Sequence, residues 1–168
     1  MGAPVLDRAL AAGGDTPSPP PSSDTKSDSK GSKSKKSDKR SSVDDPAFIS
    51  GYRAAYSTIY EQHDYAAAIP QLRALDHDDR ADVANLIGYS YRKLGQYEQS
   101  KEWYERALAA DPNHVRTWQY YGLWQVEQGH RDRAEYHLKK IEELAGKDNE
   151  DYRNLAAALA SSKPGSVY

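Results

Sequence analysis

The side chains that could bind a metal ion or act as a nucleophile are histidine, aspartate, glutamate and serine, because the sequence contains no cysteine. The five histidines are His63, His77, His114, His130 and His137. A metal site needs two or more converging ligands, yet neither an H-E-x-x-H motif nor a histidine pair at i, i+4 occurs. The G-x-S-x-G motif and the glycine-rich phosphate loops are also absent. We therefore predict that the protein is not an enzyme and has no catalytic residue, metal site or cofactor.

A second cluster of chemical interest is the basic stretch from Lys26 to Arg40. It contains seven basic and two acidic residues, a net charge of +5. Such a stretch can bind nucleic acid or an anionic surface by charge alone. No aromatic residue is interleaved to stack on bases, so a solvated spacer is the favoured interpretation. Together with Pro17 and the run Pro19–Pro21, this composition predicts that residues 1–45 form a disordered tail.

Composition excludes several classes of protein. The 168 residues carry a net charge of −2 and a mean hydropathy of −0.93, so neither strong nucleic-acid binding nor a membrane-embedded domain is indicated. No apolar run approaches the roughly 18 residues of a membrane span. Residues 1–12 lack a basic start and contain Asp7 and Arg8, so they do not form an intact secretory signal.

From Pro46 onward, apolar residues follow helical spacing. Asp44 or Asp45 can cap a first helix that begins at Pro46 and continues to Gln62. A second helix is predicted over residues 65–76, with Pro70 tolerated near its first turn. A final helix over about 149–161 carries its apolar side chains on one face, as a terminal cap of a repeat array must.

The ordered part repeats with a period of 34 residues. Gly122 follows Gly88 by 34 residues, and Gly129 follows Gly95 by 34. Both Gly95 and Gly129 are expected to adopt the left-handed conformation after a helix. We predict repeats at about 46–80, 81–114 and 115–148, a capping helix at 149–161 and a frayed end at 163–168. The first repeat is two residues shorter, and the deletion is placed in the turn 77–80. That repeat has Tyr56 in place of the repeated glycine, which should push its two helices slightly apart.

The middle repeat, residues 81–114, resembles a tetratricopeptide repeat. The positions that carry the resemblance are Gly88, Tyr91, Gly95, Tyr97, Ser100, Tyr104, Ala107 and Pro112. The resemblance implies an all-α, right-handed α-solenoid of three helix pairs plus the capping helix. More narrowly, the chain is similar to small bacterial exported proteins with three such repeats, which implies a periplasmic location. It departs from them in having no cysteine pair before the end helix and no intact signal, so a cytoplasmic location stays open.

In tetratricopeptide proteins the first helix of each pair lines a concave groove. The resemblance implies that the groove-lining residues here are Arg53, Ser57, Tyr60, Asn85, Tyr89, Arg92, Lys93, Arg116, Gln119 and Leu123. The arginines and the lysine among them suit a peptide carboxylate or an acidic segment, and the tyrosines and leucine suit apolar contact. The alternative for the charged positions is an ordinary solvated helix face.

The predicted function is that of a non-catalytic scaffold, which binds a peptide or helix of a partner protein in this groove. One alternative is that the basic tail anchors the chain to nucleic acid, anionic lipid or an envelope polymer, with the repeats as a spacer. Another is self-assembly through the ends of the repeat array. We expect a monomer or weak self-association, and no transmembrane segment.

Overall fold

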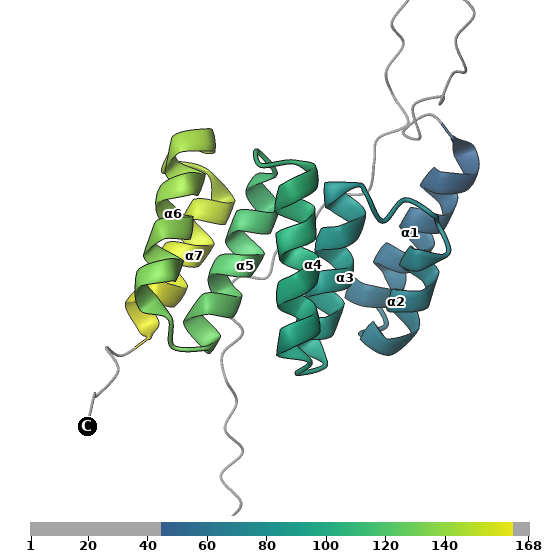
Figure 1. The fold of residues 1–168 in the computed structure, drawn as a ribbon, viewed down its shortest axis with the longest axis horizontal. Helices are drawn as coiled ribbons and strands as arrows, with labels where there is room; N and C mark the ends of the chain where they lie inside the picture. The colour runs from purple at the N-terminus through teal and green to yellow at the C-terminus, as the bar shows by residue number, and fades with distance from the viewer. Residues whose placement is uncertain (1–44, 163–168) are drawn as a thin grey trace, which may run out of the picture.

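The computed structural model describes residues 45–162, which form seven α-helices and contain no strand (Figure 1). The helices are α1 (Pro46–Tyr60), α2 (Tyr65–Arg73), α3 (Ala81–Lys93), α4 (Tyr97–Ala110), α5 (Val115–Glu127), α6 (Arg131–Ala145) and α7 (Glu150–Ser161). The predicted disordered tail, its electrostatic anchoring and the frayed C-terminus concern residues that lie outside this range.

The helices form three pairs that stand side by side in chain order (Figure 1). Within each pair the two helices pack along their length, and α3 also contacts α1 and α5. The last helix, α7, packs against both α5 and α6. The molecule is therefore an all-α solenoid of three helix pairs with a C-terminal helix on the last pair, as the sequence predicts.

Three of the helices, α1, α2 and α7, have an N-cap residue whose side chain accepts a backbone hydrogen bond. Asp45 Oδ1 accepts a hydrogen bond from the backbone N–H of Ala47 at 2.9 Å, and Pro46 takes the first helical position as predicted. Asp64 caps α2 by accepting from the backbone N–H of Ala67, also at 2.9 Å. Asn149 caps α7 in the same way. These residues satisfy backbone donors that a helix start otherwise leaves unpaired.

The turns between the helices of each pair use a left-handed residue. Gly95 has φ of +73° and Gly129 has φ of +77°, so the prediction for both glycines is confirmed. His63 lies between α1 and α2 with φ of +55°, a conformation that costs a residue with a Cβ more than it costs glycine. The first pair therefore makes the same turn at a higher conformational cost.

The first repeat is two residues shorter than the others, and the prediction that the turn 77–80 loses these residues was wrong. The connection between α2 and α3 covers residues 74–80, whereas the connection between α4 and α5 covers only residues 111–114. The shortening falls in α2, which has 9 residues against 14 in α4. Helix α2 ends at Arg73 instead of Asp76, and Asp76 itself has φ of +55°, which no α-helix can contain.

Close packing between helices depends on small residues, as the sequence predicts. A Cβ built on Gly88 would lie 2.8 Å from Cδ1 of Tyr104 and 3.3 Å from the backbone oxygen of Ser100. A Cβ on Gly122 would lie 2.4 Å from Cδ2 of Leu155. The glycines thus let α4 approach α3 and let α7 approach α5. Tyr56, at the matching position of the first pair, is half-buried.

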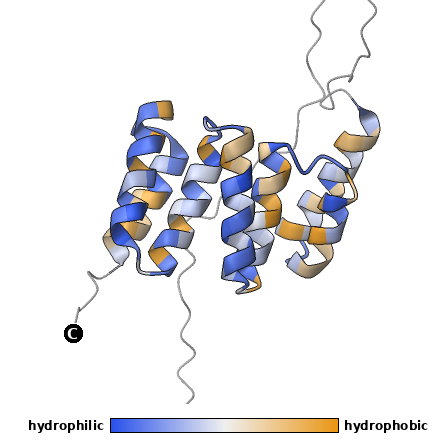
Figure 2. Ribbon diagram, in the orientation of Figure 1, coloured by the Kyte–Doolittle hydropathy of each residue, from blue (hydrophilic) through white to orange (hydrophobic). Residues whose placement is uncertain are grey.

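The apolar side chains of the helices meet in one continuous core along the array. On the outer helix α4, the side that faces the viewer in Figure 2 is mostly hydrophilic, whereas apolar residues line its contacts with α3. Burying a full-sized apolar side chain contributes roughly 1.5–3 kcal/mol. Each helix pair buries its apolar side chains chiefly against the neighbouring pairs. The stability of the fold therefore depends on the interfaces between successive pairs.

Candidate partner-binding face

We define the inner face as the ten predicted groove residues together with Tyr120, all of which lie on α1, α3 and α5. The structure leaves Arg53 and Lys93 exposed, and half-buries Ser57, Tyr60 and Arg116. The remaining predicted positions are buried: Asn85, Tyr89, Arg92, Gln119 and Leu123. Most of α3's contribution to this face is therefore withdrawn from solvent, which sequence periodicity did not indicate.

Three tyrosines from three different helices form a stacked cluster on this face. The ring of Tyr89 lies 5.5 Å from that of Tyr60 and 5.0 Å from that of Tyr120, centroid to centroid, with interplanar angles of 27° and 30°. The hydroxyls of Tyr60 and Tyr120 are 3.0 Å apart and share a hydrogen bond. Burial raises the pKa of the Tyr120 hydroxyl well above its ordinary value, so this hydroxyl stays neutral. This tyrosine cluster joins α1, α3 and α5.

Two of the predicted basic residues are engaged in ion pairs within the domain. The Arg92 guanidinium makes a bidentate pair with Glu127, with Nε–Oε2 and Nη2–Oε1 distances of 3.0 and 2.8 Å. Nη1 of Arg116 lies 2.8 Å from Oδ1 of Asp151, on the capping helix. The ion pair of Arg92 with Glu127 links α3 to α5, and the ion pair of Arg116 with Asp151 links α5 to α7.

These pairs change what the face can bind. The sequence indicated four basic side chains for an acidic ligand, but Glu127 and Asp151 offset the charge of two of them. Burial raises the pKa of Asp151, and the nearby Arg116 charge lowers it by less. The face is consequently less basic than predicted, and the aromatic and amide side chains at its centre are buried.

Asn85 is a buried polar residue at the centre of this face. Its side chain is 0% exposed, and neither its Nδ2 nor its Oδ1 has a hydrogen-bond partner. A buried amide without partners costs roughly 1–3 kcal/mol. The group offers one donor and one acceptor side by side, which is the complement of a peptide unit.

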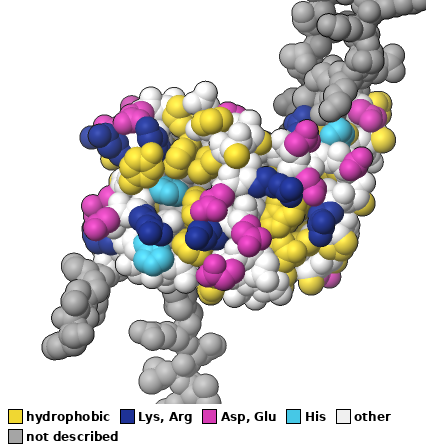
Figure 3. Space-filling model, in the orientation of Figure 1, with side chains coloured by type: hydrophobic (Ala, Val, Ile, Leu, Met, Phe, Trp, Pro, Cys, Tyr) yellow, Lys and Arg dark blue, Asp and Glu magenta, His cyan; other side chains and the backbone are white. Residues whose placement is uncertain are grey.

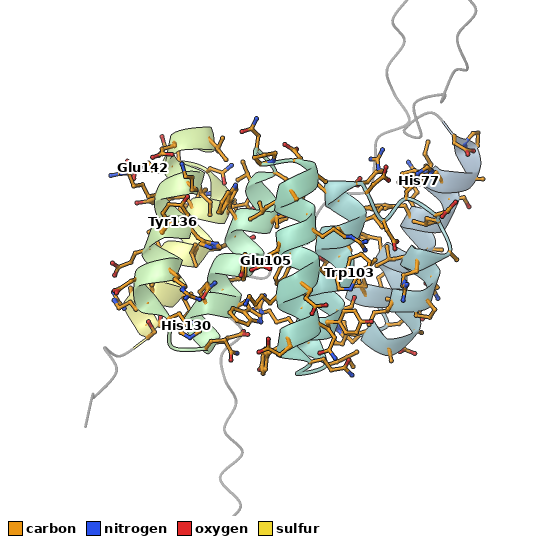
Figure 4. All side chains as sticks on the ribbon, viewed as in Figure 1. His77, Trp103, Glu105, His130, Tyr136 and Glu142 are labelled. Atoms are coloured by element: carbon orange, nitrogen blue, oxygen red, sulfur yellow. The ribbon has the colours of Figure 1, made fainter. Side chains whose placement is uncertain are left out.

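The opposite, outer surface shows no comparable arrangement. Acidic and basic side chains are interspersed over the face shown in Figure 3, and an apolar area lies toward α6. Figure 4 labels Trp103 on α4 and Tyr136 on α6. The Arg106 guanidinium covers the Trp103 ring at 4.7 Å, and Lys140 lies 5.7 Å from the Tyr136 ring. Such contacts are typical of a solvated helix surface.

Sequence reasoning missed two members of the inner-face network. Tyr120 lies one residue after a predicted groove position, and the available signal was a tyrosine near this side of each first helix. Asp151 belongs to the capping helix, and no periodicity within the repeats points to it. Both act by contact between helices that are separate in sequence.

Within residues 45–162, no group of three or more histidine, aspartate or glutamate side chains could hold a metal ion. None of the helices in that range has the length and apolar character needed to cross a membrane.

Comparison with protein families agrees with this architecture. Residues 81–114 match the family model described as a tetratricopeptide repeat. The search of curated proteins gave no significant match. The matched residues are α3, α4 and their flanking turns, and the helix pairs on either side of them are stacked in the same manner. Residues 81–114 therefore form a tetratricopeptide repeat, and the stacked helix pairs on either side are consistent with an array of such repeats. Repeats of this kind generally mediate protein–protein interactions.

Proposed function

We propose that the protein is a non-catalytic scaffold that binds an extended segment or a helix of a partner protein along the inner face of α1, α3 and α5. Three features support this proposal: the tyrosine cluster, the mixed charges at the rim, and the Asn85 amide. Tyrosines supply contact area at low entropic cost, and amides fix the register of a bound backbone.

The observation that carries the proposal is the unpartnered Asn85 amide. A core position filled only for packing would be occupied by an apolar residue, since an amide without partners lowers stability. Because the side chain is 0% exposed, a ligand backbone reaches the amide only when the side chains that cover it move aside; it would then donate to Oδ1 and accept from Nδ2. The cost of the amide in the free protein is then recovered on binding.

The test is the substitution Asn85→Leu in the full chain. Peptides are first selected for binding to the wild-type protein from a displayed library, and the affinity of one selected peptide is then measured by fluorescence anisotropy. We expect Asn85→Leu to weaken binding at least about tenfold, the equivalent of 1.4 kcal/mol, while thermal stability rises.

The matched control is Gln99→Leu, which makes a comparable polar-to-apolar change at an exposed position of α4. It should leave the affinity unchanged. The proposal is wrong if the selected peptides bind Asn85→Leu as tightly as they bind the wild type. The double change Tyr89→Ala with Arg92→Ala is a less direct test, because Arg92 also holds α3 to α5 through Glu127.

A further inference from the structure

The inner face is closed by its own side chains in the free protein. Tyr89, Tyr120 and Leu123 are 4%, 0% and 4% exposed, and the Asn85 side chain is 0% exposed. Asn85 and Tyr89 lie one helical turn apart on the same side of α3. A partner can therefore reach Tyr89 only after the rings that pack on it from α1 and α5 have moved.

The contact that closes the face joins the first helix pair to the third. The Tyr89 ring packs against the ring of Tyr60 on α1 and that of Tyr120 on α5, and the hydroxyls of Tyr60 and Tyr120 are 3.0 Å apart. Within the described residues, no Cα atom of α1 lies within 8 Å of a Cα atom of α5. The two helices thus meet through side chains, and this contact can part without a change inside either helix.

The first helix pair is attached to the second chiefly on the outer side. Helix α2 packs along α3, whereas α1 makes only a short contact with α3. Asp78, in the connection between α2 and α3, lies 4.0 Å from Nε of Arg73 and 3.9 Å from Nη1 of Arg106 on α4. Both guanidiniums also lie near the ring of Trp103, at 6.0 and 4.7 Å, on the outer surface (Figure 4). These contacts can hold the pair while its inner side moves.

The position of this pair in the array also permits movement. It stands at one end of the described row of helices, so only one neighbouring pair packs along it (Figure 1). Its connection to the second pair, residues 74–80, is longer than the connection 111–114 that joins the second pair to the third. Loop residues of this kind absorb the backbone rotations of a hinge.

The closed arrangement carries a cost beneath the tyrosines. Neither Nδ2 nor Oδ1 of the buried Asn85 amide has a hydrogen-bond partner. Opening the face would let water or a partner bind these atoms, which offsets the loss of the hydrogen bond between Tyr60 and Tyr120. Ring contacts and one neutral hydrogen bond favour the closed form, and an unsatisfied amide opposes it.

We propose that the Tyr60–Tyr120 contact is a latch, and that α1 and α2 swing together about their outer contacts to open the inner face. The inference rests on the proposed function in one respect, because the opened face is the one assigned to a partner; the movement itself needs no partner. Binding then selects the open form, and the apparent affinity equals the intrinsic affinity reduced by the fraction of molecules that are open.

The movement is measured by double electron–electron resonance between two nitroxide labels, placed at introduced cysteines because the chain has none of its own. The reporting labels are at Ala54→Cys on α1 and Ala157→Cys on α7, and the reference labels are at Glu102→Cys on α4 and Ala157→Cys. All three positions are exposed. We expect Tyr60→Ala to lengthen the 54–157 distance by on the order of 5 Å, the width of an extended chain, and to leave the 102–157 distance unchanged.

The matched control is Tyr136→Ala, because this tyrosine is 53% exposed and lies on α6. It should leave both distances unchanged. Tyr60→Phe keeps the ring and loses the hydrogen bond, so it should lengthen the 54–157 distance in a smaller fraction of molecules. An unchanged 54–157 distribution in Tyr60→Ala would overturn the latch, and so would equal changes in the two label pairs.

Hydrogen exchange separates a swing of the first helix pair from its unfolding. The backbone amides of α1 and α2 should stay protected in Tyr60→Phe, since both helices move as a unit. Exchange of these amides at the rate of an unfolded chain would overturn the latch.

The selected peptide distinguishes the latch from the partner-binding function. Added to the doubly labelled wild type, the peptide should lengthen the 54–157 distance. It should bind Tyr60→Phe roughly two- to tenfold more tightly, the effect of one lost hydrogen bond on the open fraction. Peptide binding with an unchanged distance refutes only the latch. A longer distance in Tyr60→Ala, with no peptide that binds, refutes only the partner-binding function.

Discussion

His137 shows how a single residue of the last repeat is constrained by its surroundings. The side chain is 5% exposed, and its ring packs edge-on against the rings of Trp118 and Tyr121 at centroid distances of 5.1 and 4.8 Å. Its Nδ1 is 3.2 Å from the backbone carbonyl oxygen of Trp118, to which it can donate. Burial lowers the pKa of His137 to about 4, so the ring is neutral in the folded protein at physiological pH.

We predict that this histidine makes the protein less stable in mild acid. The unfolded chain binds a proton at its ordinary pKa of 6.5, while the folded protein resists protonation until about pH 4. Stability from this group is therefore complete above pH 6.5 and falls as pH decreases toward 4, with a loss of about 2 kcal/mol between pH 7.5 and 5. Urea unfolding monitored by circular dichroism at the two pH values measures the loss.

The diagnostic variant is His137→Gln, which cannot titrate. Its absolute stability changes because its packing changes, so the quantity to compare is the difference in unfolding free energy between pH 7.5 and 5. That difference should shrink in His137→Gln and stay as in the wild type in His130→Gln, whose side chain is exposed. Equal pH dependence in all three proteins would contradict the assignment.

At the scale of elements, contact between the two helices of a pair depends on specific glycines. Gly88 lies opposite α4, whereas Gly51 lies opposite Leu75 in the connection that follows α2. A Cβ at Gly88 would meet the rigid Tyr104 ring and the Ser100 backbone, whereas a Cβ at Gly51 would lie 2.5 Å from the end of the flexible Leu75 side chain. The middle helix pair should therefore tolerate an added Cβ at Gly88 less well than the first helix pair tolerates one at Gly51.

The prediction is that Gly88→Ala destabilises the protein by about 1–3 kcal/mol, because α4 must move away from α3. Gly51→Ala should be close to neutral, since Leu75 can change rotamer and alanine favours a helix by about 1 kcal/mol over glycine. Chemical denaturation of both variants gives the comparison. A neutral Gly88→Ala would mean that Tyr104 is not held in place.

The contact between α5 and the capping helix α7 depends on a charge. We predict that Arg116→Met costs about 3 kcal/mol or more, because it leaves the Asp151 carboxylate buried without its cation. Adding Asp151→Leu should restore most of that loss, since an apolar pair of similar volume needs no charge compensation. A double-mutant cycle of unfolding free energies measures the coupling; an additive double variant would exclude a coupled pair.

At the scale of the whole molecule, the helices of each pair pack against those of neighbouring pairs, and the Tyr60–Tyr120 hydrogen bond is a side-chain link between the first pair and the third. Disruption at one end should therefore remain near that end. Leu155 is fully buried on α7 and lies against Gly122 of α5. The capping helix thus closes the array by covering the last pair.

We predict that Leu155→Ala costs about 2–5 kcal/mol locally and increases amide hydrogen exchange in α5, α6 and α7 more than in α1 and α2. Hydrogen-exchange mass spectrometry of the full chain resolves the helices separately. A uniform increase along the chain would show instead that the array unfolds as one cooperative unit.

The sequence alone determined the repeat architecture, because helix spacing, caps and turn glycines are local signals. The 34-residue period, the cap at Asp45 and the left-handed glycines at 95 and 129 could all be predicted in this way. The two-residue shortening was assigned to the wrong element, since periodicity measures spacing between repeats and does not show which segment loses residues.

The character of the inner face was decided only by the tertiary structure. The sequence placed Asn85, Tyr89 and Arg92 on one side of a helix, but not what each of them meets there. The partners are Tyr60 and Tyr120 for Tyr89 and Glu127 for Arg92, while the Asn85 amide is left without one. These contacts join side chains about 30 residues apart, and only the stacking of helix pairs brings them together. The charge and polarity of a binding face therefore follow from packing between repeats, which no single helix encodes.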